Sequence, residues 1–173
     1  MKLTLPLTKE KVEMLKAGDI IKLSGMIYTA RDAAHERLAL LIHEEKALPF
    51  ELQDSVIYYV GPTPAKPGAV IGSAGPTTSY RMDSYTKALL DLGLKGMIGK
   101  GNRSEEVVHH MKKNGSIYFA AVGGAGALLA QHIKKSEMIA FEDLGPEAIH
   151  RLDVEDFPVI VAIDCFGNSL FTN

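Results

Sequence analysis

Cysteine is almost absent from this sequence, because Cys165 is the only one among its 173 residues. A single cysteine cannot form a disulfide within the chain, and such a count is typical of a reducing compartment, so the sequence predicts a cytoplasmic protein. The same count excludes a cysteine-ligated cluster or a Cys-rich zinc site built from this chain alone.

Long apolar runs and a large net charge are also lacking. No run approaches the roughly 20 apolar residues that a membrane-spanning helix needs, and residues 1–19 lack the apolar core and cleavage site of a signal peptide. The formal net charge is -2 and the pI is about 6.3, which does not suggest a general binder of nucleic acid or of membrane surfaces. We therefore expect neither a nucleic acid nor a membrane among the partners.

The residues that are present predict one globular domain over 1–173. The hydrophobic content of 46% is enough for a substantial core, and no repeat or linker divides the chain. Caps and hydrophobic periodicity predict helices at 8–15, 31–45, 84–93, 105–115, 125–133 and 146–154, and strands at 19–30, 54–61, 95–102, 116–124, 136–143 and 157–164. A turn at Ser24–Gly25 is expected to divide the first strand segment, and Pro146 to open the last helix. The alternation predicts an α/β fold with some parallel pairing.

Residues 61–78 are rich in proline and glycine and are expected to form mostly loop. A loop of this length in a small domain is more often functional or partner-facing than idle. We therefore expect residues 61–75 to face a partner.

Cationic residues occur beside helix starts or glycine turns at three places. Arg31 lies in "TARDAAH", Thr77 and Arg81 lie in "GPTTSYRMD", and Lys100 and Arg103 lie in "GKGNRS". A helix N-terminus offers free N–H groups to an anion, and an arginine fork matches a carboxylate in bidentate fashion. The three places together favour a site for an anionic ligand.

Each place also has a plain structural explanation. Arg31 is about as well explained by a surface ion pair with Asp32 or Glu36, Thr77 and Thr78 by helix capping, and Lys100 by a solvated turn. His35, one turn after Arg31, is better explained as a helix-surface or capping residue than as a catalytic one.

Two other patterns carry no site. The glycines around Gly124 and Gly126 do not complete the G-x-G-x-x-G fingerprint of dinucleotide-binding proteins, because Leu129 stands at its last position. Close packing of a helix on a sheet explains them better. His109 and His110 are adjacent and therefore point about 100° apart on a helix, which is no metal pattern.

Five segments together resemble a known family: "TARDAAH", "GPTTSYRMDSY", "GKGNRS", "GGAGALLA" and "EAIHRLDVEDFPVIVAIDCFGNSLF". They are similar to the C-terminal part of class I, iron–sulfur-dependent fumarate hydratases, and equally to the separate β subunit of two-subunit fumarate and L-tartrate dehydratases. The resemblance runs from about residue 20 to the end.

The resemblance implies a three-layer β/β/α swivelling domain with mixed sheets. It implies a partner α subunit whose cysteines hold a [4Fe–4S] cluster, an α2β2 assembly, and an active site between the two chains. The implied reaction is the reversible hydration of a dicarboxylate, fumarate, to L-malate. The alternatives are an L-tartrate dehydratase β subunit and a non-catalytic anion-binding or assembly module.

The resemblance also implies residue roles. Arg31 and Arg81 would bind substrate carboxylate oxygens, Thr77 would lie at the proton-transfer position, and Lys100 would bind the substrate or the developing charge. Family members often have Ala-Gly where this chain has Ser79–Tyr80. That departure leaves open whether Tyr80 narrows the pocket or packs outside it.

Overall fold

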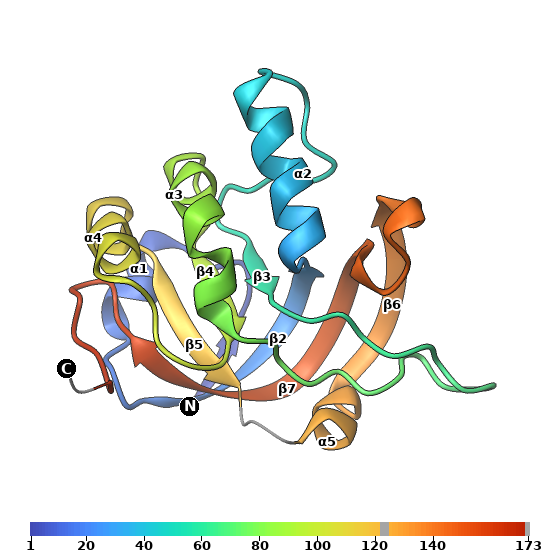
Figure 1. Ribbon diagram of the computed structural model, residues 1–173. Helices are drawn as coiled ribbons and strands as arrows, with labels where there is room; N and C mark the ends of the chain where they lie inside the picture. Colours follow the sequence, from blue (N-terminus) through green and yellow to red (C-terminus); the bar gives the residue numbers. More distant parts are fainter. Residues whose placement is uncertain (122–124, 172–173) are drawn as a thin grey trace.

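The computed structural model describes residues 1–121 and 125–171, in which strands and helices alternate (Figure 1). The described strands are β1 (Lys2–Thr4), β2 (Ile20–Thr29), β3 (Val56–Tyr58), β4 (Gly96–Gly99), β5 (Ile117–Ala121), β6 (Ile133–Ala140) and β7 (Ile149–Ile163). The described helices are α1 (Lys9–Met14), α2 (Asp32–His43), α3 (Asp83–Asp91), α4 (Glu105–Asn114) and α5 (Gly126–Ala130), with the 3-10 helices η1 (Ser79–Met82) and η2 (Glu142–Glu147). The predicted α/β class is confirmed.

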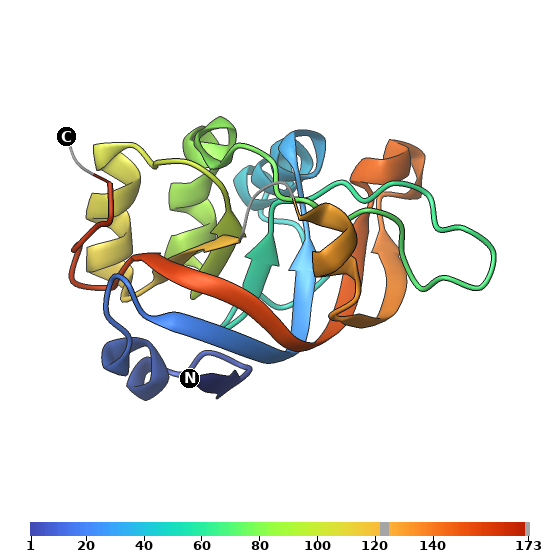
Figure 2. The same cartoon turned by 90° about the horizontal axis from the view of Figure 1, so that it is seen from below.

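The described strands form one mixed sheet of seven strands in the order β1-β2-β3-β4-β5-β7-β6, with a further pairing of β2 with β7. Strands β1 to β5 pair in parallel, whereas β7 runs antiparallel to β2, β5 and β6. Because β7 pairs with both β5 and β2, the strands from β2 to β5 close into a ring through it (Figure 2).

Two hydrophobic cores lie on opposite faces of β3, β4 and β5. Along β3, Val56 and Tyr58 belong to one core, whereas Ile57 and Tyr59 belong to the other, because successive side chains of a strand point to opposite faces. Helices α2, α3 and α4 cover the second face, and β2 and β7 lie across the first (Figure 1). No helix of the described ranges is long and apolar enough to cross a membrane.

The prediction of a turn at Ser24–Gly25 is wrong. β2 runs unbroken through both residues. It pairs with β7 both before and after them, with a register shift between Leu23 and Gly25. Gly25 has φ +131°, and a Cβ there would lie 2.9 Å from the Leu5 Cβ, so the glycine serves a bulge that is packed against the chain. The strand continues because β7 offers partners along its whole length.

The prediction of a helix from Pro146 is also wrong. Pro146 lies inside η2, and the residues from Ile149 onward belong to the 15-residue strand β7. Leu152 and Val154 are buried at a spacing of two and pair with both β2 and β6, so sheet pairing decides the segment. Pro158 lies within this strand, opposite Lys22, instead of at its start.

Several local predictions are confirmed. The Thr8 hydroxyl accepts a hydrogen bond from the Lys11 N–H at 3.4 Å, and the Ser104 hydroxyl accepts one from the Val107 N–H at 3.2 Å. Gly115 ends α4 at φ +67°, in the left-handed region that favours glycine. These signals are local, and they persist in the folded chain.

Candidate functional site

Three adjacent parallel strands end at one edge of the sheet, and each is followed by a residue that concerns the site. Arg31 follows β2, Gly61 follows β3, and Lys100 follows β4. Neighbouring strands are about 4.8 Å apart, so the backbones of Arg31 and Lys100 lie roughly 10 Å from each other. Ligands of α/β proteins commonly bind at this edge, beyond the carboxyl ends of the strands.

The Arg31 side chain crosses the end of β3 at Gly61. A Cβ at Gly61 would lie 2.9 Å from Arg31 Cδ and 3.3 Å from Arg31 Nη1, so a larger residue would displace the arginine. The Arg31 side chain is 27% exposed. A glycine at this place therefore lets a half-buried guanidinium reach the sheet edge.

Asp32 lies between Arg31 and Arg81. Its Oδ2 is 3.0 Å from Arg81 Nε, and its Oδ1 is 3.7 Å from Arg31 Nε. The ion pair of Arg31 with Asp32, expected as the plain explanation, is thus present. The same carboxylate also contacts Arg81, which brings together two arginines that are fifty positions apart in the sequence.

Thr77 and Lys100 are joined through the backbone. The Thr77 N–H donates to the Tyr59 carbonyl at 2.8 Å, the Lys100 N–H donates to the Thr77 carbonyl at 3.3 Å, and the Ser79 N–H donates to the Lys100 carbonyl at 2.9 Å. Residues 77–79 therefore extend the sheet between the ends of β3 and β4. Thr77 is half-buried and Lys100 is exposed.

The capping explanation of the two threonines is not what the structure shows. Thr78 stands at the N-cap position of η1, but its side chain makes no capping hydrogen bond. At the start of α2, Glu147 Oε1 accepts from the Ala33 N–H at 3.2 Å. An internal carboxylate thus occupies part of the helix start that sequence reasoning offered to a ligand.

Ser79 and Tyr80, the two residues at which the resemblance implies a departure, differ in their surroundings. Ser79 is fully buried, its hydroxyl lies 2.7 Å from the Tyr118 hydroxyl, and a Cβ at Gly99 would overlap it. Burial raises the pKa of Tyr118 to about 12, so this phenol stays protonated. Tyr80 is 66% exposed and lies outside the core.

Arg103, grouped by sequence with Lys100, belongs to the core instead. Its side chain is 0% exposed, its Nε lies 2.7 Å from Asp83 Oδ1, and its Nη2 donates to the Thr86 hydroxyl at 3.0 Å. Its guanidinium stacks over the rings of Tyr59 and Tyr118. The pair "Lys100 … Arg103" is therefore divided between surface and interior.

His35 is fully buried, so the prediction of a helix-surface histidine is wrong. Its Nδ1 lies 2.9 Å from the Arg31 carbonyl, and its ring packs edge-to-face with the Tyr59 ring, with the two ring centroids 5.3 Å apart. Burial lowers the pKa of His35 from 6.5 to about 4. The imidazole is therefore neutral near pH 7 and supports the backbone at the start of α2.

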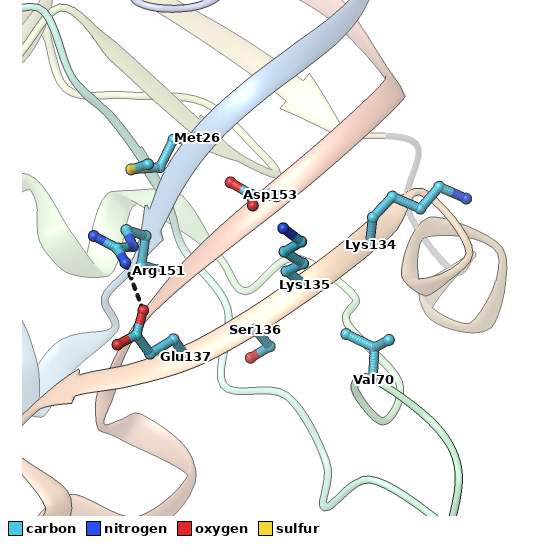
Figure 3. A pocket seen from close by; sticks show the side chains of 8 residues that line it. All are labelled: Met26, Val70, Lys134, Lys135, Ser136, Glu137, Arg151 and Asp153. Carbon is cyan, nitrogen blue, oxygen red and sulfur yellow. Dashed lines mark hydrogen bonds and ion pairs between the residues drawn. The ribbon is translucent and has the colours of Figure 1, made fainter.

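An open pocket of about 610 Å³ lies elsewhere, over β2, β6 and β7 (Figure 3). Arg151 and Glu137 in this pocket pair with each other at 2.5 Å, so their charges are already used. Arg31, Thr77 and Arg81 do not line it. The candidate site is an exposed sheet edge on this chain, distinct from that pocket.

A metal or cofactor would need suitable ligands or contacts among the described residues. The described residues include no group of three or more His, Cys, Asp or Glu that could hold a metal ion. Cys165 is buried, and burial raises the pKa of its thiol, which disfavours a metal-binding thiolate. Of the glycines near "GGAGALLA", Gly123 and Gly124 lie outside the described residues, whereas Gly126 packs against Gly75 in the loop that leads to Thr77.

The sequence model described as "Fumarase C-terminus" matches residues 1–173. The chain belongs to the fumarase C-terminus family. A protein of Methanocaldococcus jannaschii named "Putative L(+)-tartrate dehydratase subunit beta" is 42% identical over 171 residues, which cover 95% of this chain and 88% of that protein.

Two longer relatives contain a similar segment. "Fumarate hydratase class I, anaerobic" of Escherichia coli (strain K12) is 44% identical over 153 residues, which cover 87% of this chain and 28% of that protein. "Fumarate hydratase 2" of Leishmania major is 36% identical over 166 residues, which cover 95% of this chain and 29% of that protein. The relatives are thus named as a tartrate dehydratase subunit and as fumarate hydratases. The chain spans under a third of the two fumarate hydratases.

Proposed function

We propose that this chain is the β subunit of a two-subunit hydro-lyase that reversibly hydrates fumarate to L-malate. The observation that carries the proposal is the Arg31–Asp32–Arg81 cluster, which lies at the same sheet edge as Thr77 and Lys100. Two arginines contact the Asp32 carboxylate there, and Lys100 adds a third cation at the same edge, where Asp32 and Glu147 are the nearby carboxylates, so the cations outnumber the carboxylates. A dicarboxylate supplies the complementary charge.

The proposed binding roles follow from side-chain chemistry. Arg31 and Arg81 present planar forks, which match carboxylate oxygens in bidentate fashion. Removal or addition of a proton at the carbon beside a carboxylate builds negative charge on that group. Lys100, exposed at the end of β4, is placed to bind the substrate or this developing charge.

Thr77 is proposed to lie at the proton-transfer position. A threonine hydroxyl is a weak base at its ordinary pKa and needs a neighbouring cation or a relay. Lys100 is joined to Thr77 through the backbone, whereas the Arg81 Nε is already paired with Asp32. Arg81, four residues after Thr77, and Lys100 are the two candidates for that cation within this chain.

The [4Fe–4S] cluster expected for class I enzymes is proposed to be held by the α subunit, because the described residues of this chain offer no ligand set for it. When bound there, it supplies Lewis-acid chemistry toward the substrate hydroxyl and one carboxylate. The residues of this chain bind, orient and hold the proton on the other side. The proposed active site is thus shared by the two chains.

The remaining parts of the proposal concern assembly. The two cores on opposite faces of β3 to β5 support a three-layer β/β/α domain, which we propose to swivel on its partner. We propose one domain over residues 1–173, an α2β2 assembly and a cytoplasmic location.

Residues 61–75 project from the body and are proposed to contact the α subunit (Figure 1, Figure 2). The base of this arm is closed by hydrogen bonds between Thr63 and Ser73, at 3.0 Å between backbones and 2.7 Å to the Thr63 hydroxyl. Residues 63–70 are all exposed. A preformed, exposed arm loses little entropy when it docks.

L-tartrate dehydration is the second candidate, with the same chemistry on a different hydroxy acid. It is favoured by the match to the relative from Methanocaldococcus jannaschii, because the chain covers 88% of that protein. A non-catalytic anion-binding or assembly module would use the same arginines without a reaction.

Co-expression with a candidate α subunit under anaerobic conditions tests the proposal. The purified complex is assayed on fumarate, malate and both tartrates, and we expect turnover of fumarate and malate by the complex and none by the isolated chain. Turnover of tartrate alone would select the dehydratase. A loaded complex that is inactive on all four compounds would leave the non-catalytic module.

A further inference from the structure

Asp32 makes two ion pairs that differ in length. Oδ2 lies 3.0 Å from Arg81 Nε, whereas Oδ1 lies 3.7 Å from Arg31 Nε. Asp32 Oδ1 and Arg31 Nε are both buried, and both lack a hydrogen-bond partner. An N–H···O hydrogen bond is about 3.0 Å long, so these two groups face each other slightly beyond bonding distance.

Both arginines therefore present the same edge to Asp32. Each ion pair is made through Nε, at the side of the guanidinium, and the Arg31 Nη1 lies toward Gly61, 3.3 Å from where a Cβ of that residue would stand. Among the described residues, Asp32 is the carboxylate that lies within 4 Å of either arginine. Without it, two like charges at one sheet edge would repel each other with no intervening anion.

We propose that Asp32 is a positioning residue that holds the Arg31 and Arg81 guanidinium groups side by side, so that their outer edges bind one ligand carboxylate. The identity of that ligand rests on the proposed function, but the geometry of the two arginines does not. Asp32 starts α2, and Arg81 lies in η1, so the contact also ties two elements of the site together.

A first test uses the isolated chain and needs no activity. Arginine modification by phenylglyoxal is followed at each arginine by peptide mass spectrometry in wild type, Asp32→Asn and Asp143→Asn. Asp143, in η2, is the matched control, since it pairs with Arg37 of α2 at 2.8 Å and with neither Arg31 nor Arg81. The buried Arg103 serves as an internal standard of folding.

We expect Asp32→Asn to raise the modification rates of Arg31 and Arg81 several-fold and to leave Arg37 and Arg103 unchanged. Asp143→Asn should raise the rate of Arg37 alone. Unchanged rates at Arg31 and Arg81 would overturn the proposal. An equal rise at all four arginines would also overturn it, because Asp32 would then support the fold in general.

A second test uses the complex with the α subunit. Loss of a negative charge alone would strengthen binding of a dianion and lower KM, whereas loss of positioning lowers kcat. We expect Asp32→Asn to reduce kcat by between about tenfold and a hundredfold with KM unchanged or lower. Asp32→Glu keeps the charge at the helix start but is longer by one methylene, so we expect it to restore little of kcat.

The outcomes separate this inference from the proposed function. Wild-type kcat in Asp32→Asn, or full rescue by Asp32→Glu, would overturn the positioning role while leaving the hydro-lyase in place. A wild-type complex inactive on every dicarboxylate would contradict the proposed function, and the modification rates would still decide the role of Asp32.

Discussion

Two arginine–aspartate groups lie at the starts of neighbouring helices, and they differ in burial and in hydrogen bonding. Asp83 begins α3 and pairs with Arg103 at 2.7 Å, with side chains that are 13% and 0% exposed. Asp32 begins α2 and lies 3.0 and 3.7 Å from two arginines that are 46% and 27% exposed. Both use an acidic residue in the first turn of a helix, where the dipole favours it.

The difference concerns what remains unsatisfied. In the Asp83 group, Oδ1 accepts from Arg103 and Oδ2 accepts from the Ser104 N–H at 2.8 Å, so the carboxylate is fully used. In the Asp32 group, a donor and an acceptor are buried without a hydrogen bond. The first arrangement stabilises the fold, whereas the second is made by two arginine side chains that are partly exposed at the sheet edge.

The largest effect is expected from breaking the buried group. Arg103→Met should reduce the free energy of unfolding by about 3 to 5 kcal/mol, because it leaves the largely buried Asp83 carboxylate without its partner. Urea unfolding of the isolated chain measures this.

A double variant supplies the control for the buried group. Arg103→Met combined with Asp83→Asn removes the uncompensated charge and should recover a large part of the lost stability. A loss below 1 kcal/mol in the single variant would show that water already screens Asp83, and the contrast between the two groups would then disappear.

The next effect belongs to the exposed group and should appear in activity instead of stability. Arg81→Ala should lower kcat/KM of the complex by about a hundredfold or more, because it removes the proposed donor to the substrate carboxylate. Its free energy of unfolding should change by less than about 1 kcal/mol, as is usual for exposed ion pairs. Steady-state kinetics of the complex and denaturant unfolding of the chain measure the two quantities.

Arg37→Ala is the matched control for Arg81→Ala. Arg37 is similarly exposed and pairs with Asp143, but it makes no ion pair with Asp32. We expect neither activity nor stability to change appreciably. Unchanged kinetics in Arg81→Ala would remove this arginine from the site.

Sequence reasoning reached the fold wherever the signal was local. Helix caps at Thr8 and Ser104 and the glycine that ends α4 depend on neighbours within four residues. The two failures, at Ser24–Gly25 and after Pro146, both concern β2 and β7. Their pairing joins residues more than a hundred positions apart, and no local pattern encodes it.

The candidate site was partly accessible to the same reasoning. Three cationic places were noted, and the structure brings Arg31, Arg81 and Lys100 to one edge because β2 and β4 flank β3 in parallel. The sequence could not predict that Arg103 is buried and Lys100 exposed. The two residues are three positions apart in one turn, and the path of that turn decides which side chain enters the core. The bridging position of Asp32 depends on η1 folding back toward α2, although its place directly after Arg31 was a signal.

The smallest effect is expected at His35, which lies close enough to both groups for the charges of Arg103 and Asp32 to act on its pKa. Burial lowers the pKa of this imidazole, and the hydrogen bond with the Arg31 carbonyl raises it. The charge of Arg103 lowers this pKa further and that of Asp32 raises it, and the result is a pKa of about 4. Above pH 6.5 both the folded and the unfolded chain carry neutral His35, so the full stability is present. As the pH falls from 6.5 toward 4, the unfolded chain binds a proton that the folded chain does not, and stability is lost. Between pH 7.5 and pH 5 this loss should be about 2 kcal/mol.

The measurement is the pH dependence of the free energy of unfolding in wild type and His35→Gln. The variant should be less stable at pH 7.5. Because glutamine cannot titrate, the variant should lose less stability on acidification. His43→Gln, on the exposed end of the same helix, should follow the wild-type slope. Equal slopes in wild type and His35→Gln would mean that the buried imidazole accepts its proton as readily as in the unfolded chain. Burial between the Arg31 carbonyl and the Tyr59 ring would then not disfavour the charged form of His35.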